Sequence, residues 1–266
     1  MRFAEAVFGA FLVALPLWAA DADLDGVPDA LDRCPGTSFD ALADNEGCPL
    51  EGKITLAAGL SWSEGNYGGS EEIASRTRDL LIGYAKGRWN LSAAFSWLDS
   101  GVQSPLSGTQ ESSGVGDTWL SAGYGFYNGE AWSLNGRATL KLPTAGKDAG
   151  TGNVDAGVSA TLSWTAGALL PFITAGYLAT GDDSDATYDD PLSLSAGAGR
   201  GWGDLFAGAS ANWSQAQIKG MEDAKSLSLY GIYGFDGGWF ASGGYTCGLG
   251  DSVAERSVSL MIGTAF

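Results

Sequence analysis

Apolar residues alternate with polar or small residues in many separate segments of this chain. The clearest segment, 131–142, places apolar or small residues at even positions and mostly polar residues at odd positions. The even set is Trp132, Leu134, Gly136, Ala138, Leu140 and Leu142, and the odd set is Ser133, Asn135, Arg137, Thr139 and Lys141. Because successive side chains of a β-strand point to opposite faces, the segment predicts a strand with one apolar face and one polar face.

Twelve segments of this kind follow one another along the chain. Each is close to the about 9–11 residues that a tilted membrane-spanning strand needs. They lie at 53–62, 78–86, 88–98, 115–126, 131–142, 154–164, 168–179, 191–200, 203–213, 224–235, 238–248 and 255–266.

The connections between these segments alternate in length. Long polar stretches follow odd-numbered segments, at 63–77, 99–114, 143–153, 180–190 and 214–223. Tight turns follow even-numbered segments, at 87, 128–130, 165–167, 201–202 and 236–238. An even strand number with long loops at one end and short turns at the other is typical of outer-membrane β-barrels. It also predicts that both chain termini lie in the periplasm.

The last segment ends on an aromatic residue. One face of this segment carries Val258, Leu260, Ile262, Thr264 and Phe266, which are apolar apart from Thr264. We interpret Phe266 as a C-terminal signal for the barrel-assembly machinery. Aromatic residues also recur near segment ends, as two girdles at the membrane interfaces require. They are Trp62, Trp89, Trp97, Phe126, Trp132, Trp164, Trp213 and Trp239.

A soluble β-sandwich accounts for the alternation, but not for the aromatic ends, the terminal phenylalanine and the alternating connection lengths together. We therefore expect an all-β fold: an antiparallel up-and-down transmembrane β-barrel of twelve strands over 52–266, in the outer membrane of a Gram-negative bacterium.

The first twenty residues have the pattern of a secretory signal peptide. Arg2 precedes an apolar stretch at 7–18, and the small residues Ala19, Ala20 and Ala22 offer cleavage sites. The stretch is shorter than the about 20 residues of a membrane-spanning helix, so an anchor is the weaker interpretation. The expected organisation is a signal peptide at 1–20, an acidic segment at 21–51 and the barrel.

Composition narrows the function. The formal net charge is −17 and the chain contains no histidine. An acidic surface disfavours nucleic acid as a partner. The lack of histidine removes Ser-His hydrolase chemistry and most zinc sites. An enzyme would need a carboxylate or lysine mechanism, and no cluster on the expected inner faces indicates one. We therefore expect no enzymatic activity.

The acidic segment opens with the spacing of a calcium loop. Carboxylates occupy loop positions 1, 3, 5, 9 and 12, with Gly26 at position 6 and a backbone carbonyl at position 7. The predicted ligands are Asp21, Asp23, Asp25, Val27 through its carbonyl, Asp29 and Asp32. A merely acidic linker is the alternative. With the later stretches 33–35 and 44–49, the segment resembles a thrombospondin type 3 repeat. Calcium is the cofactor that this pattern predicts.

The chain has three cysteines. In an oxidising exported compartment, Cys34 and Cys48 are the natural pair because a short loop separates them. Closing such a loop is worth roughly 3 kcal/mol in the chain-entropy model. Cys247 lies in an expected strand far away, and we expect it to be a lone buried thiol.

Charged and polar residues are expected on the inner faces of the strands. Arg137 and Lys141 on a lipid-facing surface would cost about 2–4 kcal/mol each at the midplane, so they are placed inside. The full inward set is Asp117, Asn135, Arg137, Lys141, Asp155, Ser193, Ser195 and Asn212. The charged members either form a structural ion-pair ladder between neighbouring strands, which we favour for each residue, or line a conduction path and set its selectivity.

The connection 180–190 is rich in aspartate. It carries Asp182, Asp183, Asp185, Asp189 and Asp190. A solvated acidic loop is the simpler interpretation. The alternatives are a divalent-cation site that bridges lipopolysaccharide phosphates, or a mouth that repels anions.

Short motifs around neighbouring segments resemble the MetA-pathway phenol-degradation outer-membrane family. They are Gly114-Val115-Gly116-Asp117, Lys141-Leu142-Pro143-Thr144 and Gly150-Thr151-Gly152-Asn153-Val154-Asp155, with a weaker match at Gly176-Tyr177 and Thr180-Gly181-Asp182. The resemblance covers about 115–200 well.

The resemblance implies an outer-membrane protein that passes small compounds, aromatic ones included. The matching residues are Gly116, Asp117, Lys141, Pro143, Thr144, Gly152 and Asp155. Ala145, which separates Thr144 from Gly146, and the acidic segment depart from the family pattern.

Together these features predict a passive channel for small solutes, aromatic or hydrophobic ones included. Its expected partners are outer-membrane lipid and lipopolysaccharide, the barrel-assembly machinery and the solute. The alternative is a structural or interaction barrel whose calcium-binding segment docks to a periplasmic partner. A closed lumen with strong pairing of Asp117 and Asp155 to Arg137 and Lys141 would favour that alternative.

Overall fold

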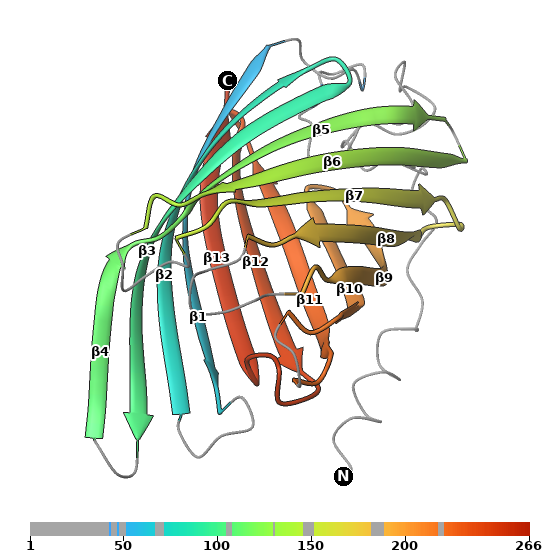
Figure 1. The fold of residues 1–266 in the computed structure, drawn as a ribbon. Helices are drawn as coiled ribbons and strands as arrows, with labels where there is room; N and C mark the ends of the chain where they lie inside the picture. Colours follow the sequence, from blue (N-terminus) through green and yellow to red (C-terminus); the bar gives the residue numbers. More distant parts are fainter. Residues whose placement is uncertain are drawn as a thin grey trace.

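The computed structural model describes Ala43, Gly47 and residues 52–66, 72–104, 108–129, 131–145, 152–181, 189–217 and 221–266. These residues form thirteen β-strand segments (Figure 1). The segments are β1 (Lys53–Gly65), β2 (Glu72–Lys86), β3 (Trp89–Ser104), β4 (Gly108–Val115), β5 (Thr118–Asn128), β6 (Trp132–Leu142), β7 (Asp155–Trp164), β8 (Leu170–Ala179), β9 (Leu192–Trp202), β10 (Leu205–Ser214), β11 (Ala224–Phe235), β12 (Trp239–Gly248) and β13 (Arg256–Ala265).

The strands close into an antiparallel barrel. Consecutive strands pair with each other except β4 and β5, and β1 pairs with β13 to complete the ring. β4 and β5 both pair with β3 and meet at Gly116 and Asp117, so they act as two halves of one strand. The predicted all-β, twelve-stranded barrel is therefore confirmed. Within the described residues, no helix is long and apolar enough to cross a membrane.

The alternation of side chains separates an outer and an inner wall. On β13 the predicted outward residues Leu260 and Ile262 are 63% and 55% exposed, whereas Ala265 is buried. Among the described residues, only Ala57 and Ala265 are fully buried apolar side chains. A soluble fold of this length would bury far more apolar surface. The large apolar side chains on the outside of the barrel therefore form a surface that faces lipid.

The two ends of the barrel differ. At the end that holds Lys53 and Ala265, here called the terminus end, strands are joined by tight turns, as predicted. Four of these turns use glycine at positive φ, among them Gly87 at 56° and Gly203 at 60°, where other residues are strained. The opposite end, here called the loop end, carries the connections after β1, β3, β6, β8, β10 and β12.

Two of the predicted long loops are wrong. The expected loop 63–77 is mostly strand, because β1 continues to Gly65 and β2 begins at Glu72. The expected loop 99–114 is likewise strand up to Ser104 and again from Gly108. These stretches lack an apolar face, yet backbone pairing between β2, β3 and β4 continues through them. Polar strands beyond the lipid have no hydrophobic signature, so the strands project further at the loop end than the alternation indicated (Figure 1).

Aromatic residues gather on the outer wall at both ends, as predicted. At the terminus end the rings of Trp89 and Tyr124 lie 4.7 Å apart, and those of Tyr127 and Trp132 stack at 3.9 Å. At the loop end, three aromatic side chains each donate a hydrogen bond to an aspartate. These bonds are Trp97 Nε1 to Asp99 (3.3 Å), Tyr177 Oη to Asp190 (2.6 Å) and Trp213 Nε1 to Asp223 (3.1 Å). Such amphipathic rings suit the two membrane–water interfaces.

Candidate functional site

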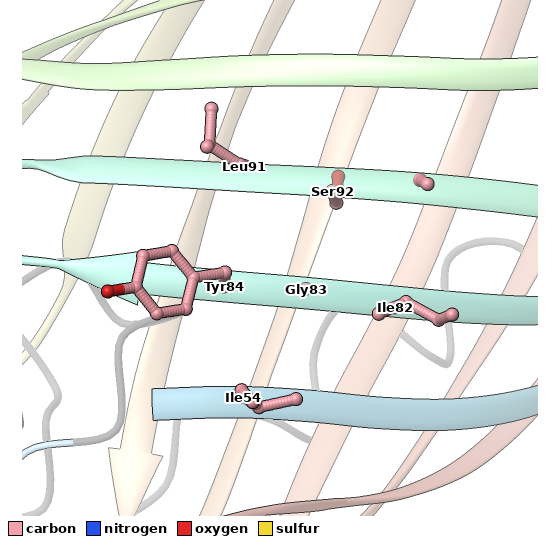
Figure 2. Close-up of a pocket in the computed structure, with 7 residues that line it drawn as sticks. Ile54, Ile82, Gly83, Tyr84, Leu91 and Ser92 are labelled. Atoms are coloured by element: carbon pink, nitrogen blue, oxygen red, sulfur yellow. The ribbon is translucent and has the colours of Figure 1, made fainter. Parts of the chain in front are cut away.

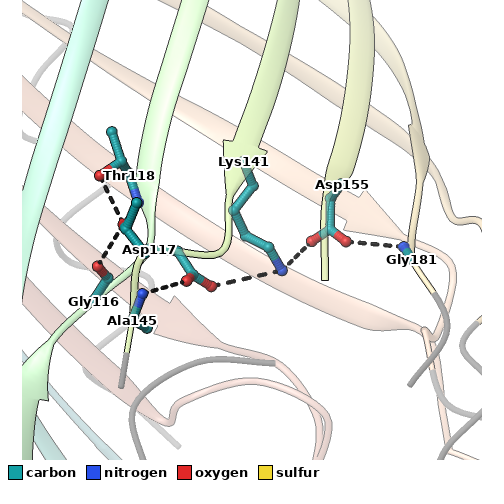
Figure 3. Close-up of polar contacts among 8 residues, drawn as sticks. Gly116, Asp117, Thr118, Lys141, Ala145, Asp155 and Gly181 are labelled. Carbon is teal, nitrogen blue, oxygen red and sulfur yellow. Dashed lines mark hydrogen bonds and ion pairs between the residues drawn. The ribbon is translucent and has the colours of Figure 1, made fainter. Parts of the chain in front are cut away.

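A buried ionic cluster lies at the loop end of β5, β6 and β7 (Figure 3). Lys141 on β6 is directly opposite Asp155 on β7, and its ammonium forms an ion pair with that carboxylate. Lys141 Nζ also lies 3.8 Å from Oδ2 of Asp117, the residue just before β5. The three side chains are only 8–9% exposed. We call Asp117, Lys141 and Asp155 the Lys141 cluster.

Each carboxylate of the cluster also holds a connection at the loop end. The backbone N–H of Ala145, which follows β6, donates to Asp117 Oδ1 at 3.0 Å. The N–H of Gly181, which follows β8, donates to Asp155 Oδ1 at 3.0 Å. One lysine and two aspartates therefore fix the starts of two connections to the barrel wall.

A second set of bonds joins the start of β5 to the end of β6. The N–H of Thr118 donates to Thr144 Oγ1 at 2.9 Å, and the two threonine hydroxyls are 2.8 Å apart. Gly116 N–H donates to the carbonyl of Ser96 at 2.9 Å. A Cβ on Gly116 would overlap Ser96 Oγ, so glycine lets the chain pass this close to β3 without displacing the serine hydroxyl. The motifs around Gly116 and Thr144 thus meet in space.

The charges of the cluster are balanced only in part, since two carboxylates share one ammonium. Burial of a charge is costly unless it is paired and hydrogen-bonded, and here each carboxylate has both an ammonium and a backbone N–H. The arrangement holds the wall and the connections in place. It offers no acid–base pair poised for catalysis.

The other predicted inward residues of β6 lie closer to the terminus end. Arg137 is opposite Gly123 on β5 and Ser159 on β7, and Asn135 is opposite Gly125 and Thr161. The structure thus brings Lys141 together with Asp117 and Asp155, while Arg137 lies four residues further along the strand. Three residues of the predicted ladder, Asp117, Lys141 and Asp155, are therefore joined by ion pairs.

Hydroxyl groups cover much of the remaining inner wall and bond to each other between strands. Inward pairs are Ser92 with Ser121, Ser133 with Ser163, Thr161 with Thr174 and Ser228 with Thr246, all 2.7–2.9 Å apart. Asn212 donates to Ser226 and Ser228 and is opposite Ser195. Ser193 is on the same inward face of β9, opposite Gly176.

Two kinds of inward residue were missed from the sequence. Asp79 on β2 lies between Gly59 and Ser96 on the inner face, and it makes no hydrogen bond or ion pair with the described residues. Large rings also face inward, at Trp119 on β5 and at Phe172, Phe206, Tyr230 and Phe240 on β8, β10, β11 and β12. The period-two pattern contains this information, but only once the inward parity of each strand is known.

The hollow that Figure 2 shows is on the other side of the wall. It is a shallow groove lined by outward side chains of Ile54, Ile82, Tyr84 and Leu91. These residues are 40–47% exposed and belong to the apolar outer surface. The groove therefore faces lipid and is not a path through the barrel.

Phe266 lies where the barrel closes. Its N–H donates to the carbonyl of Ile54 at 3.0 Å, and the N–H of Ile54 donates to the carbonyl of Phe266 at 2.8 Å. Its side chain is 64% exposed on the outer wall, where another protein can reach it.

Several predicted sites lie outside the described residues. These are the calcium ligands Asp21, Asp23, Asp25, Val27, Asp29 and Asp32, the pair Cys34 and Cys48, and three aspartates of the 180–190 connection. In the described part of the chain, no group of three or more His, Cys, Asp or Glu residues is placed to hold a metal ion. Cys247 is a free, half-buried thiol on β12.

Comparison with known proteins supports the fold. No protein-family model matches the chain, and no curated protein matches it by sequence. The COG4313 outer membrane channel from Pseudomonas putida F1 has a similar structure, with a TM-score of 0.67 and 15% identity over 81% of this chain and 96% of that one. The KdgM porin in complex with disordered oligogalacturonate gives 0.51 and 11% identity, over 80% and 98% of the two chains. The β domain of the Bordetella autotransporter BrkA gives 0.52 and 11% identity, over 81% and 100%. The chain therefore has the fold of outer-membrane β-barrels.

Proposed function

We propose that the chain is a passive channel for small solutes in the outer membrane of a Gram-negative bacterium. The observation that carries the proposal is the inner wall of a closed twelve-stranded barrel, which is built largely from glycine, serine and threonine. Barrels of eight strands are narrow enough for side chains to fill, whereas twelve strands with small inward residues leave room along the axis. The fold shared with an outer membrane channel and a porin supports the same function.

In this proposal the Lys141 cluster has a structural role at the channel mouth. It fixes the starts of the β6–β7 and β8–β9 connections through hydrogen bonds from Ala145 and Gly181. Its charged groups are directed at each other more than at the lumen. Asp79, which lies on the inner face of β2 between Gly59 and Ser96, is better placed to meet a passing ion.

The orientation and the N-terminal segment complete the proposal. Both termini face the periplasm, and the loop end faces the lipopolysaccharide leaflet. The segment 21–51 binds calcium, is closed by a disulfide between Cys34 and Cys48, and lies next to the periplasmic mouth. The rival function is a structural barrel whose segment docks to a periplasmic partner.

Planar-bilayer conductance of the refolded protein tests the channel. The measurement compares the mature chain with a variant that lacks 21–51, each in calcium and in chelator. Discrete openings are the expected result, and a rise in conductance on deletion would identify the segment as a plug. Folded protein that is electrically silent in all four conditions would contradict the channel and favour the structural barrel.

A further inference from the structure

Four large rings line one part of the inner wall. Phe172 on β8, Phe206 on β10, Tyr230 on β11 and Phe240 on β12 face inward, and each has a glycine directly opposite on a neighbouring strand. The rings of Phe206 and Tyr230 are adjacent, with centroids 6.0 Å apart. Three of the four lie within a few residues of the turns at the terminus end. We call these four residues the aromatic strip.

Each ring of the strip covers a glycine on a neighbouring strand. The glycines are Gly197 under Phe172, Gly199 under Phe206, Gly208 under Tyr230 and Gly263 under Phe240. A Cβ on Gly197 would lie 2.7 Å from Phe172 Cζ, and one on Gly208 would lie 2.6 Å from Tyr230 Oη. At Gly199 and Gly263 the overlap with the ring would be closer still.

The ring-over-glycine pairs determine how the rings lie. An inward aromatic side chain fills a lumen only if it projects from the wall. Because the residue under each ring is a glycine without a Cβ, the ring can lie flat along the neighbouring strand. One face of the ring then contacts the wall and the other faces the lumen. All four rings are half-buried, neither enclosed nor free. The strip is therefore a lining of the passage and not its filling.

The surrounding surface makes the strip distinct. Elsewhere on the inner wall, hydroxyl groups are paired across strands and the charges of the Lys141 cluster are partly neutralised. Trp119 is also inward, opposite Lys141, but it lies at the loop end and away from the strip. A flat apolar molecule gains little from those groups, but it can stack on the exposed face of an aromatic ring. Contact with the strip also removes apolar surface from water.

We infer that the aromatic strip is the specificity-determining surface of the channel, and that it favours small uncharged molecules with a flat apolar ring over puckered molecules of the same size. This inference rests on the proposed channel function. It assigns the preference to Phe172, Phe206, Tyr230 and Phe240, on β8 and β10–β12.

Two probes of matched size and polarity test the preference. Benzyl alcohol has a flat ring and cyclohexylmethanol a puckered one, and both are neutral. In planar bilayers we expect benzyl alcohol to reduce the ion current at a concentration at least threefold lower than cyclohexylmethanol. The double variant Phe206→Leu/Phe240→Leu should bring the two concentrations within twofold of each other. Ser242→Ala, an inward change on the same wall, should leave the difference intact.

The outcomes separate the inference from the function on which it rests. Equal inhibition of the wild-type current by both probes, or a preference that survives the double variant, would overturn the aromatic strip as the discriminating surface while the channel stands. A wild-type protein with no current at all would overturn the channel, and the strip with it.

The glycines give a second test that needs no solute. Gly199→Ala should lift the Phe206 ring from the wall and lower the conductance, and Phe206→Ala in the same chain should restore it. Gly234→Ala is the matched control, because a Cβ there meets only the Asp204 carbonyl oxygen at 3.9 Å. Heat-modifiable gel mobility reports that each variant is folded. Unchanged conductance in folded Gly199→Ala would contradict the wall geometry.

Discussion

Lys141 on β6 forms an ion pair with Asp155 directly opposite on β7, and both side chains are only 8% exposed. The pair joins two strands at the point where their connection leaves the wall. Asp117 completes the cluster from the β5 side. The Lys141 ammonium therefore contributes both to the stability of the barrel and to the position of the connections at this end.

Loss of that ammonium should be the most damaging single change in the cluster. Lys141→Met keeps the length of the side chain but leaves Asp117 and Asp155 buried beside each other without a cation. We expect the free energy of unfolding to fall by roughly 3–5 kcal/mol, the usual cost of an uncompensated buried charge. Reversible urea unfolding of the barrel in lipid vesicles measures it. Lys225→Met, at an exposed position, should change the midpoint little. A similar midpoint for wild type and Lys141→Met would show that the cluster contributes nothing.

The two carboxylates should control different connections. Asp117→Asn weakens the acceptor of the Ala145 N–H, and Asp155→Asn weakens the acceptor of the Gly181 N–H. Charge-assisted hydrogen bonds are about twice as strong as neutral ones, so each amide should exchange severalfold faster in its own variant only. Amide hydrogen exchange followed by NMR in detergent micelles resolves the two sites. Equal acceleration of both amides in either variant would mean that the cluster responds as a whole.

The contact between Gly116 and Ser96 should behave as a coupled pair. Gly116→Ala places a methyl group against Ser96 Oγ and should cost about 1–3 kcal/mol of stability, as overpacking usually does. Ser96→Ala removes that oxygen, so the double variant should recover most of the loss. A double-mutant cycle on urea midpoints measures the coupling. If the two substitutions instead change the urea midpoint additively, the cost of Gly116→Ala does not come from its contact with Ser96 Oγ.

Acid should loosen the connection that begins at Thr180. The hydroxyl of Tyr177 and the backbone N–H of Thr180 hold the pKa of Asp190 below its usual range. The ionised Asp190 carboxylate stabilises the folded connection through these two hydrogen bonds. Because its pKa is lowered in the folded protein, this stabilisation is complete above the ordinary carboxyl pKa and is lost as pH falls through the lowered value. We expect exchange of the Thr180 amide to accelerate over that acidic range after correction for intrinsic rates.

Tyr177→Phe is the control for that titration. It removes the hydroxyl that donates a hydrogen bond to the Asp190 carboxylate, so the pKa of Asp190 should rise and the acceleration of exchange should begin at a higher pH. An identical pH profile in Tyr177→Phe would exclude the hydroxyl as a cause of the shift.

Much of the fold follows from local pattern. The alternation along β6 and β13 predicted which residues face outward, because a strand repeats every two residues and lipid tolerates only apolar side chains. The same logic failed between 63 and 77 and between 99 and 114. There the strands run through water, where neither face must be apolar, and only pairing with β2, β3 and β4 shows that they continue.

The site divides in the same way. The sequence alone determined that Lys141 and Arg137 face inward, since charge cannot face the lipid without cost. It also determined the outward aromatic ends and the closing position of Phe266. It did not determine that Lys141 lies between Asp117 and Asp155, or that Phe206 covers Gly199 and Phe240 covers Gly263. Those relationships depend on the register between separate strands. Register is decided by closure of the whole barrel, because each strand must pair with both neighbours at once, and no single segment carries that information.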